Sequence, residues 1–308
     1  DPNVVYSHSP TTFLDGSGLN YFLLSGLSNR KTINCNENGY YAIYQNDRYG
    51  FNNPDREWDK DKIEFLLVGD SFTHGACVNE PDTISGNLRK LYENKSGVLN
   101  LGQIASGPLI EYATLREYLP IKKVKRVLWM YSEHNHLRDL MPELKDQILV
   151  NYLKDKSFTQ NLVLKNQEIQ KLRLNVFKQK TWKSERVTPL YIRNILKLTN
   201  VRIITIEIFF SVSPTKEFEN ILQFSNELIK ENNSKLYFIY LPEYPRYKTN
   251  YNNSSYLAVK KIVNELDIPF IDIHTEIFEK EQNPLKLGGA HYNVEGYRKV
   301  AEIIYKFN

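Results

Sequence analysis

Apolar and polar residues alternate along the chain in short blocks that predict an α/β fold. Residues 63–68 form an apolar run with charged residues before it and Gly69 after it, which is typical of a strand buried on both faces. Two similar runs follow at 98–101 and 127–131. The same pattern predicts two later strands, at 236–241 and 268–273.

Between these runs, apolar residues recur with the three-to-four-residue spacing of amphipathic helices. Helices are predicted at 82–92, at 109–119 with Pro120 as its stop, at 217–231, at 256–266 and at 294–306. Strands that alternate with helices favour a parallel sheet covered by helices on both faces.

Two stretches do not follow this alternation. Residues 1–61 are rich in Asn, Gly, Tyr and Ser, with a β-like piece at 40–44 and a series of turns at 47–54, so we expect an N-terminal extension packed on the core. The α/β domain itself is predicted to span 62–308. Within it, about 137–215 is long, charged and periodically apolar, which predicts a helical insertion that is either a cap over the site or a plain addition.

Composition and charge limit the classes of function. The 308 residues are 41% hydrophobic and 25% charged with a net charge of +4, so a large core needs neither metal nor disulfides. The densest basic stretch, 122–126, precedes an apolar run and is interpreted as a solvated strand entrance rather than a nucleic-acid surface. No apolar run is long enough to span a membrane. We find no signal peptide and expect no cofactor, which leaves cytoplasm and cell envelope both open.

Cys35 and Cys77 are the only cysteines. Two thiols do not make a disulfide framework, although one bridge between them remains open.

The first candidate for chemistry is Ser71, in the Gly-Asp-Ser-Phe sequence that follows the run at 63–68. A tight turn from a strand into a helix would present its hydroxyl at the sheet edge, where ligands of parallel sheets bind. Its backbone N–H would lie at a helix N-terminus, suited to a developing negative charge. The alternative is an ordinary serine cap, with Asp70 shaping the turn.

Two further candidates lie at the carboxyl ends of later elements. Asn135 follows the strand at 127–131, where its amide could donate to an oxyanion, although asparagine also simply forms turns. The flanking His134 and His136 could chelate a metal, but no third ligand has a telling spacing, so we predict no metal. His291 lies in a glycine-bounded loop before the last helix, where it could act as a general base toward Ser71.

The order and spacing of these motifs resemble the SGNH (GDSL-like) hydrolase superfamily. The resemblance covers residues 62–308 and implies a flavodoxin-like three-layer sandwich with sheet order 2-1-3-4-5. The turn-rich sequence at 47–54 also looks like that of bacterial SGNH proteins found with surface-polysaccharide genes.

By this resemblance Ser71 is the nucleophile and His291 the base. The Ser71 N–H and the Asn135 side chain are two oxyanion donors, and a third is expected after the second strand. Ala105 stands where the superfamily usually has a glycine, and Gly102 or Gly107 would serve under a different register.

The main departure from the superfamily concerns the acid that orients the histidine. An aspartate usually stands three residues before it, but this chain has Gly288 there and Gly289 next. Either a backbone carbonyl orients His291, or an acid comes from elsewhere, with Glu133, Asp272 and Glu276 as candidates. Losing this acid costs about 10⁴-fold in the serine-protease template.

Three other histidines bear on the pocket. His74 lies one helical turn after Ser71; it either faces the pocket or, as we favour, is exposed. His134 and His136 flank Asn135 and are expected to line the pocket and make it sensitive to pH.

These features predict a serine esterase that removes an ester-linked acyl group, such as acetyl, from a small molecule or a glycan. An O-acyltransferase would use the same residues with a sugar hydroxyl in place of water. A glycan-binding protein on a degenerate hydrolase fold is the third option, supported by Gly288 in place of the acid. No nucleic acid and no membrane span are expected.

Overall fold

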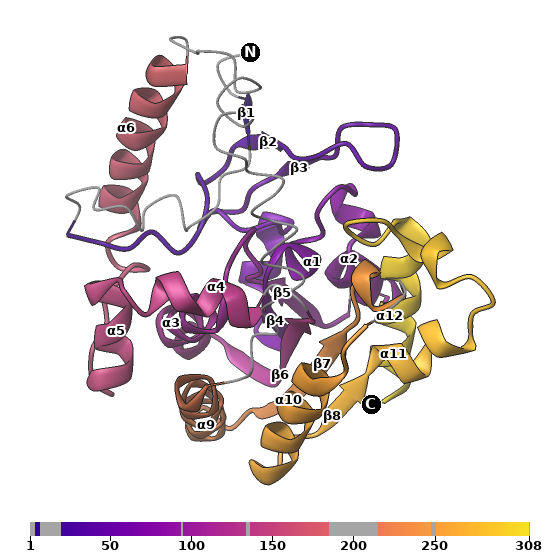
Figure 1. The fold of residues 1–308 in the computed structure, drawn as a ribbon. Helices are drawn as coiled ribbons and strands as arrows, with labels where there is room; N and C mark the ends of the chain where they lie inside the picture. Colours follow the sequence, from indigo (N-terminus) through magenta and orange to yellow (C-terminus); the bar gives the residue numbers. More distant parts are fainter. Residues whose placement is uncertain are drawn as a thin grey trace, which may run out of the picture.

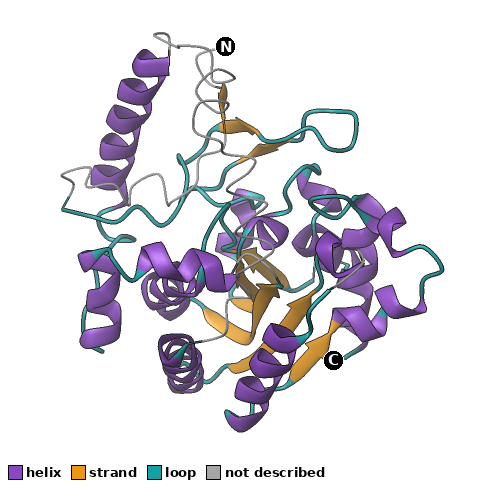
Figure 2. Cartoon of the chain, viewed as in Figure 1, coloured by secondary structure: helices purple, strands orange, loops and turns teal. Residues whose placement is uncertain are grey.

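The structure is a computed structural model, and it describes residues 4–6, 20–93, 95–133, 136–184, 215–247 and 251–307. A five-stranded parallel sheet forms its centre (Figures 1 and 2). The strand order is β5-β4-β6-β7-β8, which confirms the predicted order 2-1-3-4-5. The strands are β4 (Lys62–Gly69), β5 (Gly97–Asn100), β6 (Lys123–Ser132), β7 (Lys235–Leu241) and β8 (Phe270–Asp272).

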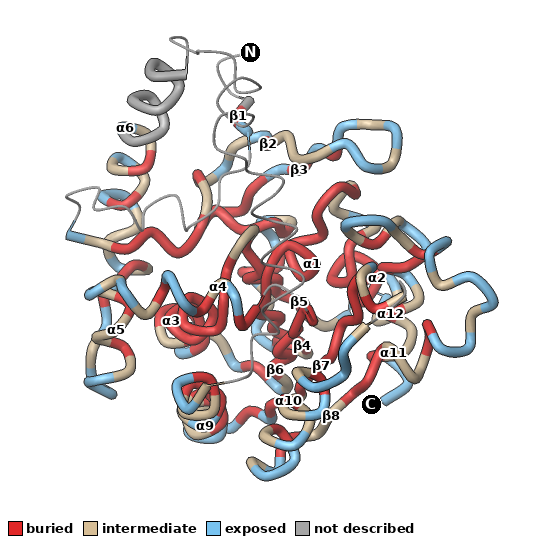
Figure 3. Tube along the Cα trace, viewed as in Figure 1, coloured by how far each residue is buried: buried red, intermediate tan, exposed pale blue. Residues whose placement is uncertain are grey.

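Side chains alternate between the two faces of this sheet, as the pleat requires. In β6, Val127, Trp129 and Tyr131 enter one hydrophobic core, whereas Leu128 and Met130 enter the other. The first core is covered by α3 (Pro108–Tyr118), α9 (Lys216–Glu231) and α10 (Ser254–Glu265). The second is covered by α2 (Ile84–Leu91) and α12 (Val294–Lys306). The fold is therefore a three-layer α/β sandwich, with its middle strands buried on both faces (Figure 3).

Most predicted elements coincide with observed ones, but the last strand is shorter than predicted. The strand was predicted at 268–273, but β8 has three residues. It ends at Asp272 because this side chain accepts a hydrogen bond from the His274 N–H (3.1 Å) and caps α11 (Ile273–Glu276). None of the helices within the described ranges has the length and apolarity needed to cross a bilayer.

A small second sheet is built by the N-terminal segment, residues 4–6 and 20–61 of the described chain. Its strands are β1 (Val4–Tyr6), β2 (Lys31–Ile33) and β3 (Ile43–Gln45), in that order. The loop between β2 and β3 reaches toward the carboxyl ends of the main strands, where the site lies (Figure 1).

Side chains of the N-terminal segment cover the free edge of β5. Asn53 accepts a hydrogen bond from the Asn100 N–H (2.8 Å) and donates to the Asn100 carbonyl (2.9 Å). Glu57 accepts from the Val98 N–H (3.0 Å), and Arg89 of α2, outside this segment, donates to the Val98 carbonyl (2.7 Å). These side chains satisfy an edge that would otherwise carry unpaired buried backbone groups.

Asp47 organises the turn that holds Asn53 in place. Its carboxylate accepts from the N–H groups of Tyr49 and Phe51 (both 2.9 Å), from Asn53 Nδ2 (2.9 Å) and from Trp58 Nε1 (2.6 Å). Burial nevertheless raises the pKa of Asp47 to about 6, against the effect of these bonds. The predicted turns at 47–54 thus form a buried hydrogen-bonded unit.

The helical insertion is described in part, as α4 (His136–Glu143), α5 (Gln147–Lys154) and α6 (Asn166–Ser184); residues 185–214 of the prediction lie outside the described residues. It contacts the N-terminal segment. Gln160 accepts from the Phe22 N–H (2.7 Å), and Arg173 donates to the Gly26 carbonyl (2.7 Å). The insertion therefore helps to anchor that segment, whereas a role as a cap stays a prediction, as do the domain boundaries.

The covered edge of β5 generates a stability prediction. Replacement of Asn53 by Ala removes the side chain that bonds both backbone groups of Asn100 and one N–H group of Arg89. We therefore expect the free energy of unfolding to be about 2–4 kcal/mol lower than that of the wild type. Denaturant unfolding measures this difference. The exposed Asn36→Ala serves as the control and should stay within about 0.5 kcal/mol of the wild type. Equal stability of Asn53→Ala and wild type would contradict the edge-covering role.

Candidate active site

The turn that carries Ser71 leaves β4 and enters the short helix α1 (Ser71–His74). Gly69 allows this close passage, since a Cβ there would lie 2.0 Å from Thr73 Oγ1 and 2.7 Å from the Met130 carbonyl oxygen. Asp70 is the helix cap and accepts from the Phe72 N–H (2.9 Å). Ser71 is therefore the first helical residue, and its N–H has no acceptor within the helix.

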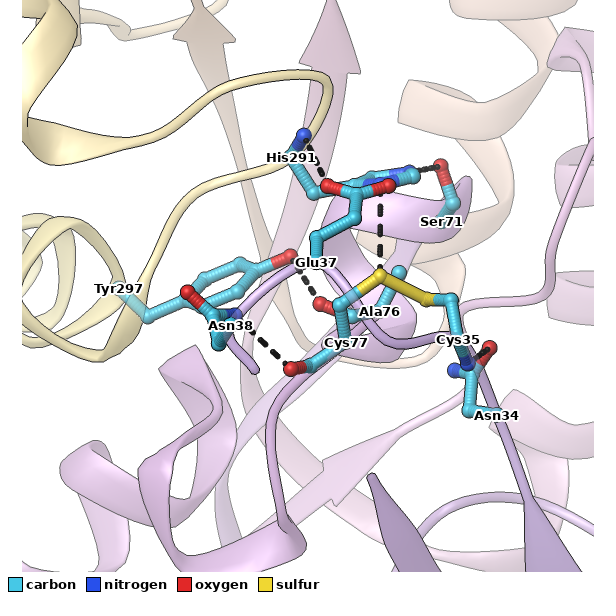
Figure 4. The surroundings of a disulfide bond; sticks show 9 residues. All are labelled: Asn34, Cys35, Glu37, Asn38, Ser71, Ala76, Cys77, His291 and Tyr297. Carbon is cyan, nitrogen blue, oxygen red and sulfur yellow. Dashed lines mark hydrogen bonds and ion pairs between the residues drawn. A yellow bond between two sulfur atoms is a disulfide. The ribbon is translucent and has the colours of Figure 1, made fainter. Parts of the chain in front are cut away.

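The imidazole of His291 meets the hydroxyl of Ser71. Their Nε2 and Oγ atoms are 2.9 Å apart (Figure 4). The loop of His291 is held by Tyr292, which donates to the Pro242 carbonyl (2.6 Å), and the His291 ring packs on Phe72 with centroids 5.1 Å apart. The structure thus brings together the two residues predicted to be nucleophile and base.

Glu37, on the loop between β2 and β3, contacts the other side of the imidazole. Its Oε1 lies 2.9 Å from His291 Nδ1, and its Oε2 accepts from the His291 backbone N–H (3.0 Å). The hydrogen bond with His291 lowers the pKa of the Glu37 carboxyl, against the effect of partial burial. Ser71, His291 and Glu37 form a hydrogen-bonded Ser-His-Glu chain of the kind found in triad hydrolases.

The three acids suggested from the sequence lie elsewhere, so those suggestions are wrong. Glu133 accepts from the Tyr240 hydroxyl (2.8 Å) and pairs with Arg246. The carboxylates of the other two contact residues of helices instead of His291: Asp272 accepts from the Tyr256 hydroxyl (2.5 Å), and Glu276 pairs with Lys280 (3.3 Å). A backbone carbonyl as the orienting group is also wrong, because His291 Nδ1 meets a carboxylate.

The loop of His291 leaves no room for a side chain at position 288, where the superfamily usually has its aspartate. A Cβ on Gly288 would lie 2.3 Å from the His291 carbonyl oxygen and 2.6 Å from Tyr292 Cα, both backbone atoms that cannot easily shift. The loop conformation observed here therefore excludes a side chain at 288, and the acid comes from another segment.

A disulfide joins the loop of Glu37 to the segment that follows α1. Cys35 and Cys77 are bonded, with Cα atoms 4.8 Å apart, so the bridge left open by the sequence is present. Glu37 lies two residues after Cys35, and Cys77 lies six residues after Ser71. The two cysteines were the signal in the sequence that could have located Glu37, because a bridge between them brings residue 37 to the nucleophile turn.

Cys35, Glu37, Cys77 and His291 lie close enough to suggest a metal site, with candidate ligand atoms within 4.8 Å of one another. The sulfur atoms are bonded to each other and offer no thiolate, and the imidazole is shared between Ser71 and Glu37. The chemistry of this cluster favours an acid-base triad beside a disulfide over a metal centre.

Among the expected oxyanion donors, Gly102 and Gly107 are already occupied. The Gly102 N–H donates to Asn100 Oδ1 (2.9 Å), and the Gly107 N–H donates to Glu143 Oε1 (2.6 Å). Ala105 adopts φ 56°, the left-handed region that usually favours glycine, and its N–H has no acceptor in the described part of the chain. This leaves Ala105 as the candidate in this loop, while Asn135 lies outside the described residues.

The prediction that His74 is exposed is wrong. Its side chain is buried, and Nε2 lies 2.9 Å from the Tyr44 hydroxyl of β3. Burial lowers the pKa of His74 to about 4, so the ring is neutral near pH 7. His74 joins α1 to the N-terminal segment instead of facing a pocket.

His136 also lies away from the pocket, which corrects its predicted role, and His134 lies outside the described residues. The His136 ring is buried; Nε2 is 2.6 Å from Glu111 Oε1 and Nδ1 accepts from the Ser132 N–H (3.0 Å). Burial lowers the pKa of an imidazole, but here the Glu111 carboxylate outweighs it and raises the pKa of His136. Ser132 in turn donates to Asp70 (2.5 Å), which links this buried cluster to the turn of Ser71.

A cavity of about 340 Å³ opens beside the Ser71 hydroxyl and the His291 ring. Its other walls come from both parts of the chain: Tyr6, Ile33, Asn34 and Cys35 from the N-terminal segment, and Ala76 and Ile104 from the α/β core. The segment that supplies Glu37 thus also shapes the space into which a substrate would fit.

Comparison with known proteins gives structural likenesses alone. No protein-family profile matches the chain, and no curated protein sequence matches it. One similar solved structure is a protein assigned to the lipolytic G-D-S-L family from Desulfitobacterium hafniense DCB-2, with 14% identity over 81% of this chain and 100% of that one and a TM-score of 0.45. A second is an acetyl xylan esterase, AlAXEase, with 10% identity over 80% of this chain and 99% of that one and a TM-score of 0.45. A third is a lipase/acylhydrolase from Enterococcus faecalis, with 13% identity over 80% of this chain and 95% of that one and a TM-score of 0.44.

These structures include a G-D-S-L protein, the group that the sequence motifs resemble. At identities of 10–14% and TM-scores of 0.45 or below, they leave the reaction and the substrate of this chain open.

Proposed function

We propose that the chain is a serine esterase of the SGNH type that acts through an acyl-serine intermediate. The observation that carries this proposal is the continuous chain of contacts from the Ser71 hydroxyl through the His291 imidazole to the Glu37 carboxylate, with 2.9 Å at each step. A serine is a weak nucleophile unless an adjacent base takes its proton, and this base has an acid behind it.

In the first step, the Ser71 oxygen attacks the acyl carbonyl while His291 Nε2 takes the hydroxyl proton. The imidazole then carries a positive charge next to the Glu37 carboxylate. Because the hydrogen bond lowers the pKa of Glu37, this carboxylate stays ionised where a histidine base works. Glu37 would hold the proton-bearing Nδ1 in place and stabilise the imidazolium.

The negative charge that develops on the substrate oxygen would be met by backbone N–H groups. The Ser71 N–H lies in the first turn of α1, and the Ala105 N–H is a second donor. His291 then returns its proton to the leaving alcohol. A water molecule, deprotonated by the same imidazole, releases the acyl group from Ser71.

Glu37 weakens the case for a catalytically degenerate binding protein. That case depended on the missing acid at Gly288, and the N-terminal segment offers an acid with the required contact to His291. A protein that merely binds glycans needs no Ser-His-Glu chain. The cavity beside Ser71, with its apolar Ile33, Ala76 and Ile104, has room for an acyl group, and an ester on a glycan remains the substrate class that we favour.

The nucleophile is tested with p-nitrophenyl acetate. Wild-type protein should give turnover with an acyl-enzyme burst, and Ser71→Ala should lower the rate on the order of 10³-fold or more. Ser157→Ala, in an exposed turn, is the matched control and should behave as wild type. Absence of both burst and turnover in wild type, as in Ser71→Ala, would rule out the proposed reaction.

The same assay, repeated with a sugar acceptor, distinguishes hydrolysis from transfer. Unchanged release of free acetate supports the esterase. Acetylated sugar formed at the expense of free acetate would assign the acyl-serine to an O-acyltransferase instead.

The acid is tested by Glu37→Gln. The variant should lower kcat/KM on the order of 10²- to 10⁴-fold, because the amide no longer stabilises the imidazolium or fixes its tautomer. The matched control is Glu276→Gln, which changes one of the acids suggested from the sequence and should leave kcat/KM unchanged. A Glu37→Gln rate close to wild type would show that His291 works without this acid.

A further inference from the structure

The loop that carries Glu37 has little of its own to hold it. Between β2 and β3, residues 34–41 are all partly or fully exposed, and the Glu37 side chain itself is 33% exposed. Backbone hydrogen bonds tie Asn34 and Cys35 to Ala42, which closes the loop on itself without attaching it to the core. Few buried contacts are the mark of a segment that opens locally.

Two attachments on one residue of the core hold the loop near the site. Cys35 is bonded to Cys77 Sγ, and Asn38 Nδ2 donates to the Cys77 carbonyl (2.9 Å). Glu37 lies between these two points, and Figure 4 shows its carboxylate held over the disulfide, facing His291. The bridge thus closes the shortest covalent path between the acid and the nucleophile turn.

The Cys77 end of this bridge is fixed relative to Ser71. Cys77 is fully buried, and its neighbour Ala76 donates its N–H to the Ser71 carbonyl (2.9 Å) and accepts from the Tyr297 hydroxyl of α12 (3.2 Å). Cys77 Sγ lies 3.9 Å from His291 Nδ1. The position of a residue bonded to Cys77 is therefore fixed relative to both Ser71 and His291.

We propose that the Cys35–Cys77 disulfide is a positioning element of the catalytic site, which holds the Glu37 carboxylate on His291. This inference rests on the proposed serine-esterase function. Its consequence is that the enzyme is fully active only with the bridge closed, as in an oxidising compartment. Reduction by a dithiol such as dithiothreitol breaks the S–S bond, gives two cysteine thiols and oxidises the dithiol to its cyclic disulfide.

A double-mutant cycle on the whole chain tests this coupling. Its four proteins are the oxidised wild type, Cys35→Ser/Cys77→Ser, Glu37→Gln, and the triple variant. Loss of the bridge should lower kcat/KM on the order of 10²-fold, as Glu37→Gln does. In the Glu37→Gln background the same change should cost less than about 3-fold, since the contact is already lost. Circular dichroism at the assay temperature verifies that each variant is folded.

The inference would be overturned if removal of the bridge lowered kcat/KM equally in the wild-type and Glu37→Gln backgrounds. It would also be overturned if the enzyme without the bridge were as active as the wild type. Reduction of the wild type with dithiothreitol provides a second route that changes no residue. The low-field proton resonance of the His291 Nδ1–H···Glu37 bond gives a readout that needs no activity. It should be present in the oxidised protein and lost on reduction, and its persistence would contradict the inference even if the esterase assay itself fails.

Discussion

The contact between Glu37 and His291 is the interaction on which the candidate site depends. A serine hydroxyl is a weak nucleophile unless an adjacent base takes its proton, and the position three residues before His291 is a glycine in this chain. The carboxylate that meets Nδ1 comes from a residue 254 positions earlier. Every element that fixes the N-terminal segment relative to the α/β core therefore bears on the base.

Several independent contacts fix that segment. Asn53 and Glu57 complete the edge of β5, so that the segment continues the hydrogen bonding of the main sheet. Arg173 of the insertion holds it from another side, and the disulfide secures the loop of Glu37 next to the nucleophile turn. The segment is thus structurally part of the site and lines the cavity beside Ser71.

The sequence was sufficient to predict the layered core and two residues of the Ser-His-Glu chain. Apolar runs and helical periodicity predicted the strands and helices, and the resemblance to SGNH hydrolases implied the sheet order that the structure shows. The motifs around Ser71 and His291 predicted their pairing. Glu37 belongs to no motif and no periodic pattern, because it lies in an exposed loop between strands of three residues each, too short to show periodicity. The signal that could have located it was the pair of cysteines. His74 was misjudged because its burial depends on Tyr44, and the docking of that residue on α1 is a tertiary effect.

The rate at which a fluorophosphonate modifies Ser71 tests the central claim most directly, because it reports the reactivity of the serine without any knowledge of the natural substrate. If Glu37 completes the triad, the second-order rate constant near pH 7 should fall on the order of 10²-fold or more in Glu37→Gln, with labelling still confined to Ser71. Equal rates in the two proteins would contradict the account and leave a Ser71–His291 dyad without an acid.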